Sequence, residues 1–301
     1  MPVFKARYLK EAIESILKQT DSSWELILVN DASPDKIADI VGQYHDSRIS
    51  YYVNDENIGG KNIILNWNQC LKYASGQYLI LASDDDVYNR EFLACVNECI
   101  NYYPIVDLIR TRVQRIDSKG NVTDFDQLYK DWLSQMEFIF YWSKGWISCI
   151  SNYVFKRETL MKQGGFVDFS CAWFSDDASI IKMAEKGVAN TRDILFSFRN
   201  SDISISWTFN VEVLKKKWKA TNDFYYWFEN ELLCINSDKV FLSVYQNNAI
   251  FNVRNKVKRM FSQLIREFPF SELGCVLKFL YKDKILYKKE KIHLLIDYLL
   301  K

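Results

Sequence analysis

Apolar and polar positions alternate in blocks that predict helices and strands in turn along the first hundred residues. Residues 8–20 carry one apolar stripe with Lys and Glu opposite, the pattern of an amphipathic helix. Residues 26–29 and 78–82 are unbroken apolar runs, which indicate strands buried on both faces. The remaining patterns predict helices at 34–45, 59–76 and 90–103 and a strand at 49–54. This alternation predicts an α/β fold whose mostly parallel sheet is flanked by helices.

The pattern changes after residue 105. A polar break at residues 118–121 suggests a hairpin, and an aromatic-rich segment at 128–142 predicts a helix, or a helix and a loop. Further predictions are strands at 146–155 and 193–199 and helices at 156–163 and 175–186. From Asn210 onward only helical patterns follow, rich in Lys and aromatic residues. We therefore expect a first domain of residues 1–207 and a helical, basic C-terminal region of residues 208–301.

Composition narrows the function classes. The 39 Lys and Arg residues nearly cancel the 38 Asp and Glu residues, so no net charge favours nucleic acid as a partner. Seven cysteines form no CxxC pair, and two histidines are too few for an obvious zinc site. Free thiols suit a reducing cytoplasm. No secretory signal and no apolar run of roughly 18 residues is found, so we expect a cytoplasmic protein with at most a peripheral membrane contact.

Three adjacent carboxylates, Asp84, Asp85 and Asp86, follow the apolar run at 78–82. Ligands of parallel sheets bind at the carboxyl ends of the strands, so these acids are expected at the ligand edge. One of these acids could cap the N-terminus of the helix that is predicted to follow. Capping would not explain the other two acids. Mg²⁺ and Mn²⁺ take carboxylate oxygens and leave positions for a diphosphate. The cluster therefore favours a divalent metal that bridges to phosphate.

Other polar residues at predicted element ends carry candidate chemistry. Asn30 and Asp31 end the first long strand, where they could form a turn or bind a nucleobase edge. Asp176 and Asp177 precede a helix, where one could cap it and the other could act as a general base. Arg199 follows the last strand and could pair with a phosphate or be solvated.

In their order and spacing, these segments resemble family 2 glycosyltransferases, enzymes of the GT-A fold, over about residues 1–207. The matching motifs are MPVFK, WELILVNDAS, the Asn57-Ile58-Gly59 turn, ASGQYLILASDDD, GGF, SDDASIIKMAEKG and FRNSDIS. The resemblance implies an inverting transfer of a sugar from a nucleotide-diphosphate sugar, in particular a UDP-sugar. The implied acceptor is a hydroxyl of a glycan or lipid-linked molecule in the synthesis of cell-surface polysaccharide or glycolipid.

The resemblance also implies roles for individual residues. The nucleotide donor would be bound by Pro2, Val3, Phe4, Asp31, Asp84 and Arg199, and a divalent Mn or Mg ion by Asp85 and Asp86. Ser83 stands where the family's first Asp usually lies, and the motif can also be read as Asp84-x-Asp86. The assignment of the metal ligand is therefore open by one residue.

For the catalytic base, counting back from Gly187 places Asp176 on the family's Asp, with Asp177 as the alternative. In an inverting reaction this carboxylate removes the proton from the acceptor hydroxyl, and no covalent enzyme intermediate is required. Arg199 would stabilise the leaving group. The acceptor side, about residues 113–146, carries no motif from which the acceptor can be read.

One departure from the family concerns the amino end. The family's first strand precedes the motif matched by MPVFK, whereas this sequence begins at Met1-Pro2, so we expect that strand to be missing. Either the start was assigned to an internal Met or the chain is truncated. The alternative function is therefore a catalytically inactive glycosyltransferase-like binding subunit.

The C-terminal region offers two basic amphipathic helices with aromatic residues, at 214–228 and 253–268. They could lie on an anionic membrane surface near a lipid-linked acceptor. Alternatively, they could pack on the first domain and expose their lysines. If these helices do lie on a membrane, the protein is expected at the inner face of the cell membrane.

Overall fold

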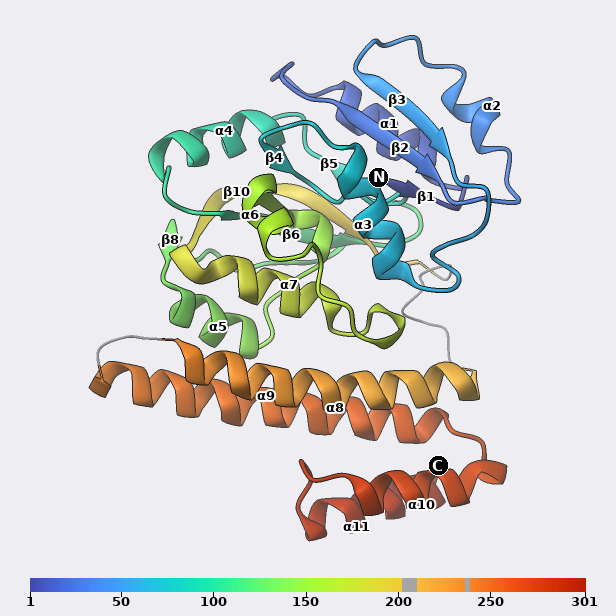
Figure 1. The fold of residues 1–301 in the computed structure, drawn as a ribbon, viewed down its shortest axis with the longest axis vertical. Coiled ribbons are helices and arrows are strands. Elements are labelled where there is room, and N and C mark those ends of the chain that lie inside the picture. Colours follow the sequence, from blue (N-terminus) through green and yellow to red (C-terminus); the bar gives the residue numbers. More distant parts are fainter. Residues whose placement is uncertain (202–209, 236–238) are drawn as a thin grey trace.

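The computed structural model describes residues 1–201, 210–235 and 239–301. Strands are covered by helices in the first two thirds of the chain, and four helices follow (Figure 1). The predicted boundary between residues 207 and 208 lies outside the described residues. The helices of the first part are α1 (Leu9–Leu17), α2 (Ile37–Val41), α3 (Ile63–Tyr73), α4 (Phe92–Tyr102), α5 (Gln135–Ser143), α6 (Arg157–Lys162) and α7 (Ser175–Met183).

The strands form two sheets. The first has the order β1 (Pro2–Val3), β2 (Leu26–Asn30) and β3 (Ile49–Val53) and is parallel throughout. The second has the order β4 (Tyr78–Leu79), β9 (Tyr153–Lys156), β6 (Leu108–Ile116), β10 (Val188–Arg199) and β5 (Val87–Tyr88), with β7 (Val122–Phe125) on β6 and β8 (Trp132–Leu133) on β10. Only β6 and β10 pair in parallel within it. The predicted α/β class is confirmed, with parallel and antiparallel pairs in the second sheet.

Several predicted elements are shorter than the patterns suggested. Of residues 78–82 only Tyr78 and Leu79 pair with a neighbouring strand, β9. The strand predicted at 146–155 begins only at Tyr153, because residues 150–152 form a 3₁₀ turn. The Asn152 side chain stabilises that turn by accepting from the Cys149 N–H and donating to the Thr111 carbonyl. The hairpin predicted around residues 118–121 is confirmed by the antiparallel pairing of β6 and β7.

Helix starts follow from local side-chain chemistry. α3 begins at Ile63 because the Asn62 side chain accepts a hydrogen bond from the Leu65 N–H. α5 begins with a capping box in which Ser134 and Glu137 bond each other's backbone N–H. Both helices then contribute side chains to the largest hydrophobic core. These two helices therefore have starts that the sequence encodes locally.

The C-terminal helices are α8 (Val211–Cys234), α9 (Lys239–Glu267), α10 (Leu273–Lys282) and α11 (Lys288–Leu299). α8 and α9 lie side by side against the end of the first part that carries α5 and α7, and α10 and α11 lie beyond them (Figure 1). Trp218, Phe224 and Phe261 are buried in the same core as Leu108 of β6. Packing on the first domain is therefore confirmed for the segments 214–228 and 253–268.

The chain begins with a two-residue strand, β1, inside the MPVFK motif. Pro2 and Val3 pair with Val29 and Asn30 of β2, and the Met1 ammonium donates to the Ile27 carbonyl at 2.7 Å. Burial lowers the pKa of this ammonium group. An apolar cavity of about 510 Å³ lies beside Met1, lined in part by β2, β4 and α4. The backbone of residues 2–4, which we expect at the nucleotide pocket, is thus placed beside the end of β2.

Candidate active site

The acidic loop, residues 83–86, lies between the ends of β1 and β10. Asp84 accepts hydrogen bonds from the backbone N–H groups of Phe4 and Lys5, both at 2.9 Å. Burial raises the pKa of the Asp84 carboxyl, and these two bonds act against that rise. Two of the predicted donor-binding residues, Phe4 and Asp84, are thus joined directly. Pro2 and Val3 lie in the strand just before them.

Arg199 and Asp86 hold the acidic loop from the protein interior. Asp86 is 2% exposed and accepts from the Arg199 N–H at 2.8 Å, while Arg199 Nε donates to the Asp85 carbonyl at 2.8 Å. Burial and the neighbouring Asp85 charge raise the pKa of Asp86 well above its usual range.

The Arg199 guanidinium is not solvated. It forms an ion pair with Glu11 at 2.6 Å and lies over the Tyr8 ring, and the residue is 2% exposed. Its contacts with the protein position the acidic loop. Its predicted contact with a donor phosphate stays a prediction.

Asp85 differs from the two acids beside it. Among the described residues, the hydrogen bond to its carboxylate comes from the Ser83 hydroxyl, which meets Oδ1 at 2.5 Å. The residue is half-buried, and Oδ2 receives no hydrogen bond from the described chain. Asp84 and Asp86 are each bonded to backbone N–H groups, so Asp85 is the acid of this loop best able to bind a ligand.

The residues of the acidic loop fit one particular mode of metal binding. Within the described ranges, no group of three or more His, Cys, Asp or Glu side chains converges to hold a metal by itself. Mg²⁺ and related ions are often held by one or two carboxylates together with substrate phosphates. The available oxygen of Asp85 suits that mode, with Asp86 directly behind it.

Asp31 lies at the end of β2 and is buried. Its carboxylate accepts from the Asn54 side chain at 2.8 Å and from the N–H groups of Ile58 and Gly59 at 2.9 and 2.7 Å. These three bonds fix the turn at 57–59 against the strand end. Asn54 was missed by the sequence reasoning, because only its position at the end of a predicted strand distinguished it. The predicted base-recognition role of Asp31 stays a prediction.

Gly59→Ala is expected to lower the free energy of unfolding by about 1–3 kcal/mol. A Cβ at residue 59 would lie 2.8 Å from Asp31 Oδ2 and 3.2 Å from Asn66 Nδ2. Urea unfolding followed by circular dichroism measures the change. The matched control is Gly274→Ala in α10, where a Cβ meets nothing within 4 Å, and we expect it to be neutral or stabilising by up to about 1 kcal/mol. Equal stabilities of the two variants would contradict the close approach.

Asp176 and Asp177 begin α7 and have different surroundings. Asp177 accepts from the Trp142 indole N–H at 2.6 Å and forms an ion pair with Lys256 of α9 at 3.3 Å. For Asp176, burial and then the Asp177 charge raise the pKa to about 7, while backbone N–H groups and Lys256 act to lower it. A carboxylate with a pKa near neutrality is suited to removing a proton. This pKa favours Asp176 over Asp177 as the predicted base, while the contacts with Trp142 and Lys256 are made by Asp177.

Lys256→Met is expected to raise the pKa of Asp176 above its value of about 7, by about one unit. The substitution removes a cation that favours the ionised carboxylate, so the neutral form gains. Carboxyl ¹³C chemical shifts followed by NMR against pH measure the change. Lys258→Met, on the same helix but paired with Glu290 at 3.3 Å, is the control and should leave Asp176 unchanged. If Asp176 has the same pKa in both variants, Lys256 does not influence the Asp176 carboxyl.

The two acidic clusters, residues 84–86 and 176–177, both act electrostatically on one side chain, the Cys149 thiol. Burial raises the pKa of the Cys149 thiol well above its usual range, and the negative charges of Asp86 and then Asp176 raise it further. Cys149 comes just before the 3₁₀ turn that leads into β9. The fold therefore places an acid of each cluster within electrostatic range of Cys149. No pattern in the sequence marked this cysteine.

Two solved structures with a similar fold contain bound nucleotide sugars. The match to S. aureus TarS 1-349 in complex with UDP-GlcNAc has a TM-score of 0.70 at 14% identity and covers 99% of this chain and 90% of that chain. The mannosyltransferase PcManGT from Pyrobaculum calidifontis, in complex with GDP-Man and Mn²⁺, matches with a TM-score of 0.52 at 15% identity, covering 100% and 84%. At such identities the likeness shows the fold alone, and that fold is GT-A.

Sequence relatives match over a shorter stretch. The Escherichia coli UDP-Glc:alpha-D-GlcNAc-diphosphoundecaprenol beta-1,3-glucosyltransferase WfgD is 35% identical over 89 residues, which are 29% of this chain and 34% of that protein. The matched stretch amounts to about a third of the length of the curated relatives. The model of the family described as Glycosyl transferase family 2 matches residues 1–178, more than half of the chain. The chain therefore belongs to glycosyltransferase family 2.

Proposed function

We propose that this protein transfers a sugar from a UDP-sugar to a hydroxyl group of a glycan or lipid-linked acceptor, with inversion at the anomeric carbon. The observation that carries the proposal is the acidic pair in the first turn of α7, where Trp142 and Lys256 contact Asp177 and burial raises the pKa of Asp176 to about 7. The UDP-GlcNAc complex of TarS and the UDP-Glc in the name of WfgD support the choice of nucleotide. The process is the synthesis of cell-surface polysaccharide or glycolipid.

In this reaction Asp176 accepts the proton of the acceptor hydroxyl while that oxygen forms a bond to the anomeric carbon. The bond from that carbon to the diphosphate oxygen breaks, and the nucleoside diphosphate leaves with the electron pair. Asp177 keeps Asp176 in place through its own contacts with Trp142 and Lys256. Asp84 and Arg199 fix the acidic loop on which the donor would lie.

A divalent Mn or Mg ion is part of the proposal. Asp85 would hold it, with Asp86 supporting the loop from the interior. When bound, such an ion stabilises the negative charge that develops on the leaving diphosphate. Two roles in the donor site rest on the family resemblance alone. Asp31 would recognise the nucleobase, and Arg199 would contact a phosphate.

The test is release of UDP from UDP-glucose and UDP-N-acetylglucosamine, with Mn²⁺ present, measured with and without acceptor glycosides. We expect acceptor-dependent release with at least one donor. Thermal shift in the same solutions identifies the alternative, since a ligand at 100 times its Kd stabilises by about 2.7 kcal/mol. Stabilisation by a nucleotide sugar without any release would favour the catalytically inactive binding subunit.

A peripheral contact with the inner face of the cell membrane also belongs to the proposal. Among the described residues, no helix combines the length and the apolar character needed to cross a bilayer. Apolar side chains that stay exposed on α10, α11 and the turn between them are Leu277, Tyr281, Tyr287, Ile292, Ile296 and Leu299. Lysines intersperse them, so this surface suits anionic lipid better than α8 and α9, whose aromatic residues are largely buried. Co-sedimentation with phosphatidylglycerol vesicles, with Tyr281→Glu as the variant, tests the contact, and equal binding by both proteins would contradict it.

A further inference from the structure

A pocket of about 450 Å³ lies between the segment that follows β7 and the end of α5. Its lining includes Asp124, Gln127, Tyr129, Tyr141, Lys144 and Trp146. It falls in the region in which the sequence carries no motif, and neither the donor site nor the base uses its side chains. Aromatic rings and a few polar groups together are typical of sites for small polar ligands.

Three aromatic side chains shape the pocket by packing on one another. The centre of the Tyr129 ring lies 5.0 Å from that of Trp146 and 5.3 Å from that of Tyr141. The planes of these ring pairs meet at 75° and 58°. A pyranose ring has an apolar face of C–H groups that can pack on an aromatic ring, and hydroxyl groups at its edge that need hydrogen-bond partners. Asp124, Gln127 and Lys144 provide such partners around the rings. The lining therefore has the chemistry of a sugar site.

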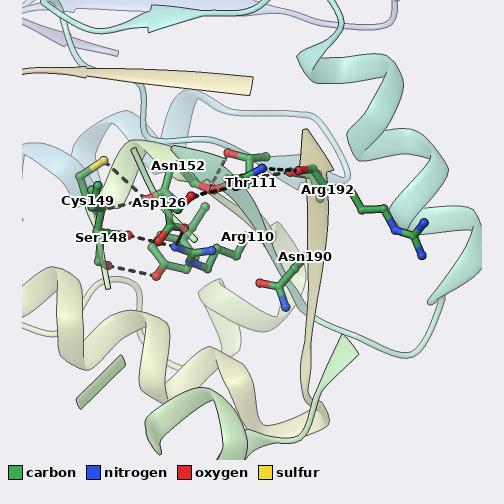
Figure 2. A network of polar contacts seen from close by, with 12 residues as sticks. Arg110, Thr111, Asp126, Ser148, Cys149, Asn152, Asn190 and Arg192 are labelled. Carbon is green, nitrogen blue, oxygen red and sulfur yellow. Dashed lines mark hydrogen bonds and ion pairs between the residues drawn. The ribbon is translucent and has the colours of Figure 1, made fainter. Parts of the chain in front are cut away.

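Buried polar contacts lie at the floor of the pocket. Arg110 and Asp126 form a buried ion pair, and the Arg110 guanidinium lies 4.0 Å from the centre of the Trp146 ring and donates to the Ile147 carbonyl at 3.0 Å. Figure 2 shows this pair in one polar network with Ser148 and Cys149. Such a floor holds Trp146 in one orientation without a ligand.

Trp146 is a buried part of the pocket wall. Its side chain is 9% exposed, and its indole N–H has no hydrogen-bond partner within the part of the chain that the structure describes. A buried donor left without a partner costs about 1–3 kcal/mol. Because protein atoms cover that nitrogen, a ligand in the pocket would contact the ring of Trp146 and not its N–H.

The pocket is linked to the catalytic side at two points. Tyr141 lines it, and the next residue, Trp142, donates to Asp177 beside Asp176. Trp146 also lines it, and three residues further on is Cys149, on whose thiol the charges of Asp86 and Asp176 act. Three residues span at most about 11 Å even when fully extended. A sugar in the pocket can therefore belong to the same molecule as the hydroxyl that Asp176 would deprotonate.

We propose that this pocket binds a pyranose ring of the acceptor. The inference rests on the proposed function and names a part of its acceptor site. Tyr129, Tyr141 and Trp146 would form the apolar walls, and Asp124, Gln127 and Lys144 would contact the hydroxyl groups of the sugar. The acceptor is accordingly recognised through its sugar, and a lipid attached to it would lie outside the pocket.

The experiment has a binding arm that needs no turnover. The probes are p-nitrophenyl β-glycosides of glucose, galactose and N-acetylglucosamine, added to protein labelled with ¹⁵N at the tryptophan indoles. We expect at least one probe to shift the resonance of the Trp146 indole, which is assigned by its loss in Trp146→Phe. If no probe moves that resonance, the pocket does not bind sugar. This arm gives the same answer whether or not the protein turns out to be an active transferase.

The kinetic arm uses Tyr141→Leu, with Tyr102→Leu, a 78% exposed tyrosine at the end of α4, as the matched control. We expect Tyr141→Leu to raise the KM for the probe at least about 10-fold, the effect of losing about 1.4 kcal/mol, while hydrolysis of the donor without acceptor stays within about twofold. An unchanged KM would overturn the proposal. If the wild-type protein shows neither donor hydrolysis nor transfer, the proposed function is contradicted. The binding experiment would then show by itself whether the pocket binds a sugar.

Discussion

Asp176→Asn should reduce kcat for sugar transfer roughly 10²- to 10⁴-fold, the usual contribution of a positioned general base. An amide of nearly the same shape cannot accept the proton of the acceptor hydroxyl. Donor binding, measured by thermal shift with UDP, should be unchanged, because the acidic loop and β1 do not depend on this side chain. The matched control is Asp39→Asn on α2, which is exposed and lies outside the site.

The pH dependence provides a second readout of the same group. Because burial and Asp177 raise the pKa of Asp176 to about 7, the carboxyl is protonated and inactive as a base below that pH. Activity of the wild-type protein should therefore rise as the pH increases through about 7, and the residual activity of Asp176→Asn should lack this rise. A variant that retains the rise, or more than about a tenth of kcat, would mean that the base is another residue, of which Asp177 is the first to examine.

Asp85→Asn should reduce transfer by more than about 100-fold, since a metal at a leaving diphosphate contributes several kcal/mol to the transition state. The variant should also weaken Mn²⁺ binding in the presence of UDP, measured by the loss of the free-ion signal in electron paramagnetic resonance. Asp85 is the residue to substitute because its carboxylate makes one hydrogen bond, to Ser83, within the described chain. Its neighbours are bonded to backbone N–H groups.

Asp84→Asn distinguishes the two ways of aligning the acidic loop with the family motif. The amide oxygen can still accept from Phe4 and Lys5, so this variant should keep its fold and most of its Mn²⁺ affinity. If Asp84→Asn loses the metal and Asp85→Asn retains it, the motif is aligned as Asp84-x-Asp86. If neither substitution changes Mn²⁺ binding, the metal is not held by this loop.

Local patterns predicted a large part of this fold. The stripe of residues 8–20 and the apolar run of residues 26–29 became α1 and β2, because helical and strand periodicities need only near neighbours. The run at 78–82 shows the limit of such patterns. Its apolar side chains are those of a strand, yet only two of its residues find a partner strand, β9, which lies more than seventy residues further along the chain. Pairing partners at that separation are not encoded in the run itself.

The candidate site divides in the same way. Motif order by itself located Asp31, residues 84–86 and residues 176–177 as functional candidates and connected them with the glycosyltransferase family, which the family match over residues 1–178 confirms. Counting along the chain could not separate Asp176 from Asp177. They are distinguished by Trp142 and Lys256, which contact Asp177, and by the raised pKa of Asp176.

Arg199 and α9 show most directly what the sequence alone determined and what it did not. The sequence placed an arginine after a strand and basic amphipathic helices at the end of the chain, because composition and periodicity are local properties. Only the tertiary structure shows that Arg199 is buried, pairs with Glu11 and donates to the Asp85 carbonyl of the acidic loop. It also shows that Lys256 of α9 forms an ion pair with Asp177. The pKa of a carboxylate depends on burial and on charges within a few ångströms, and those are set by residues that are distant in the chain.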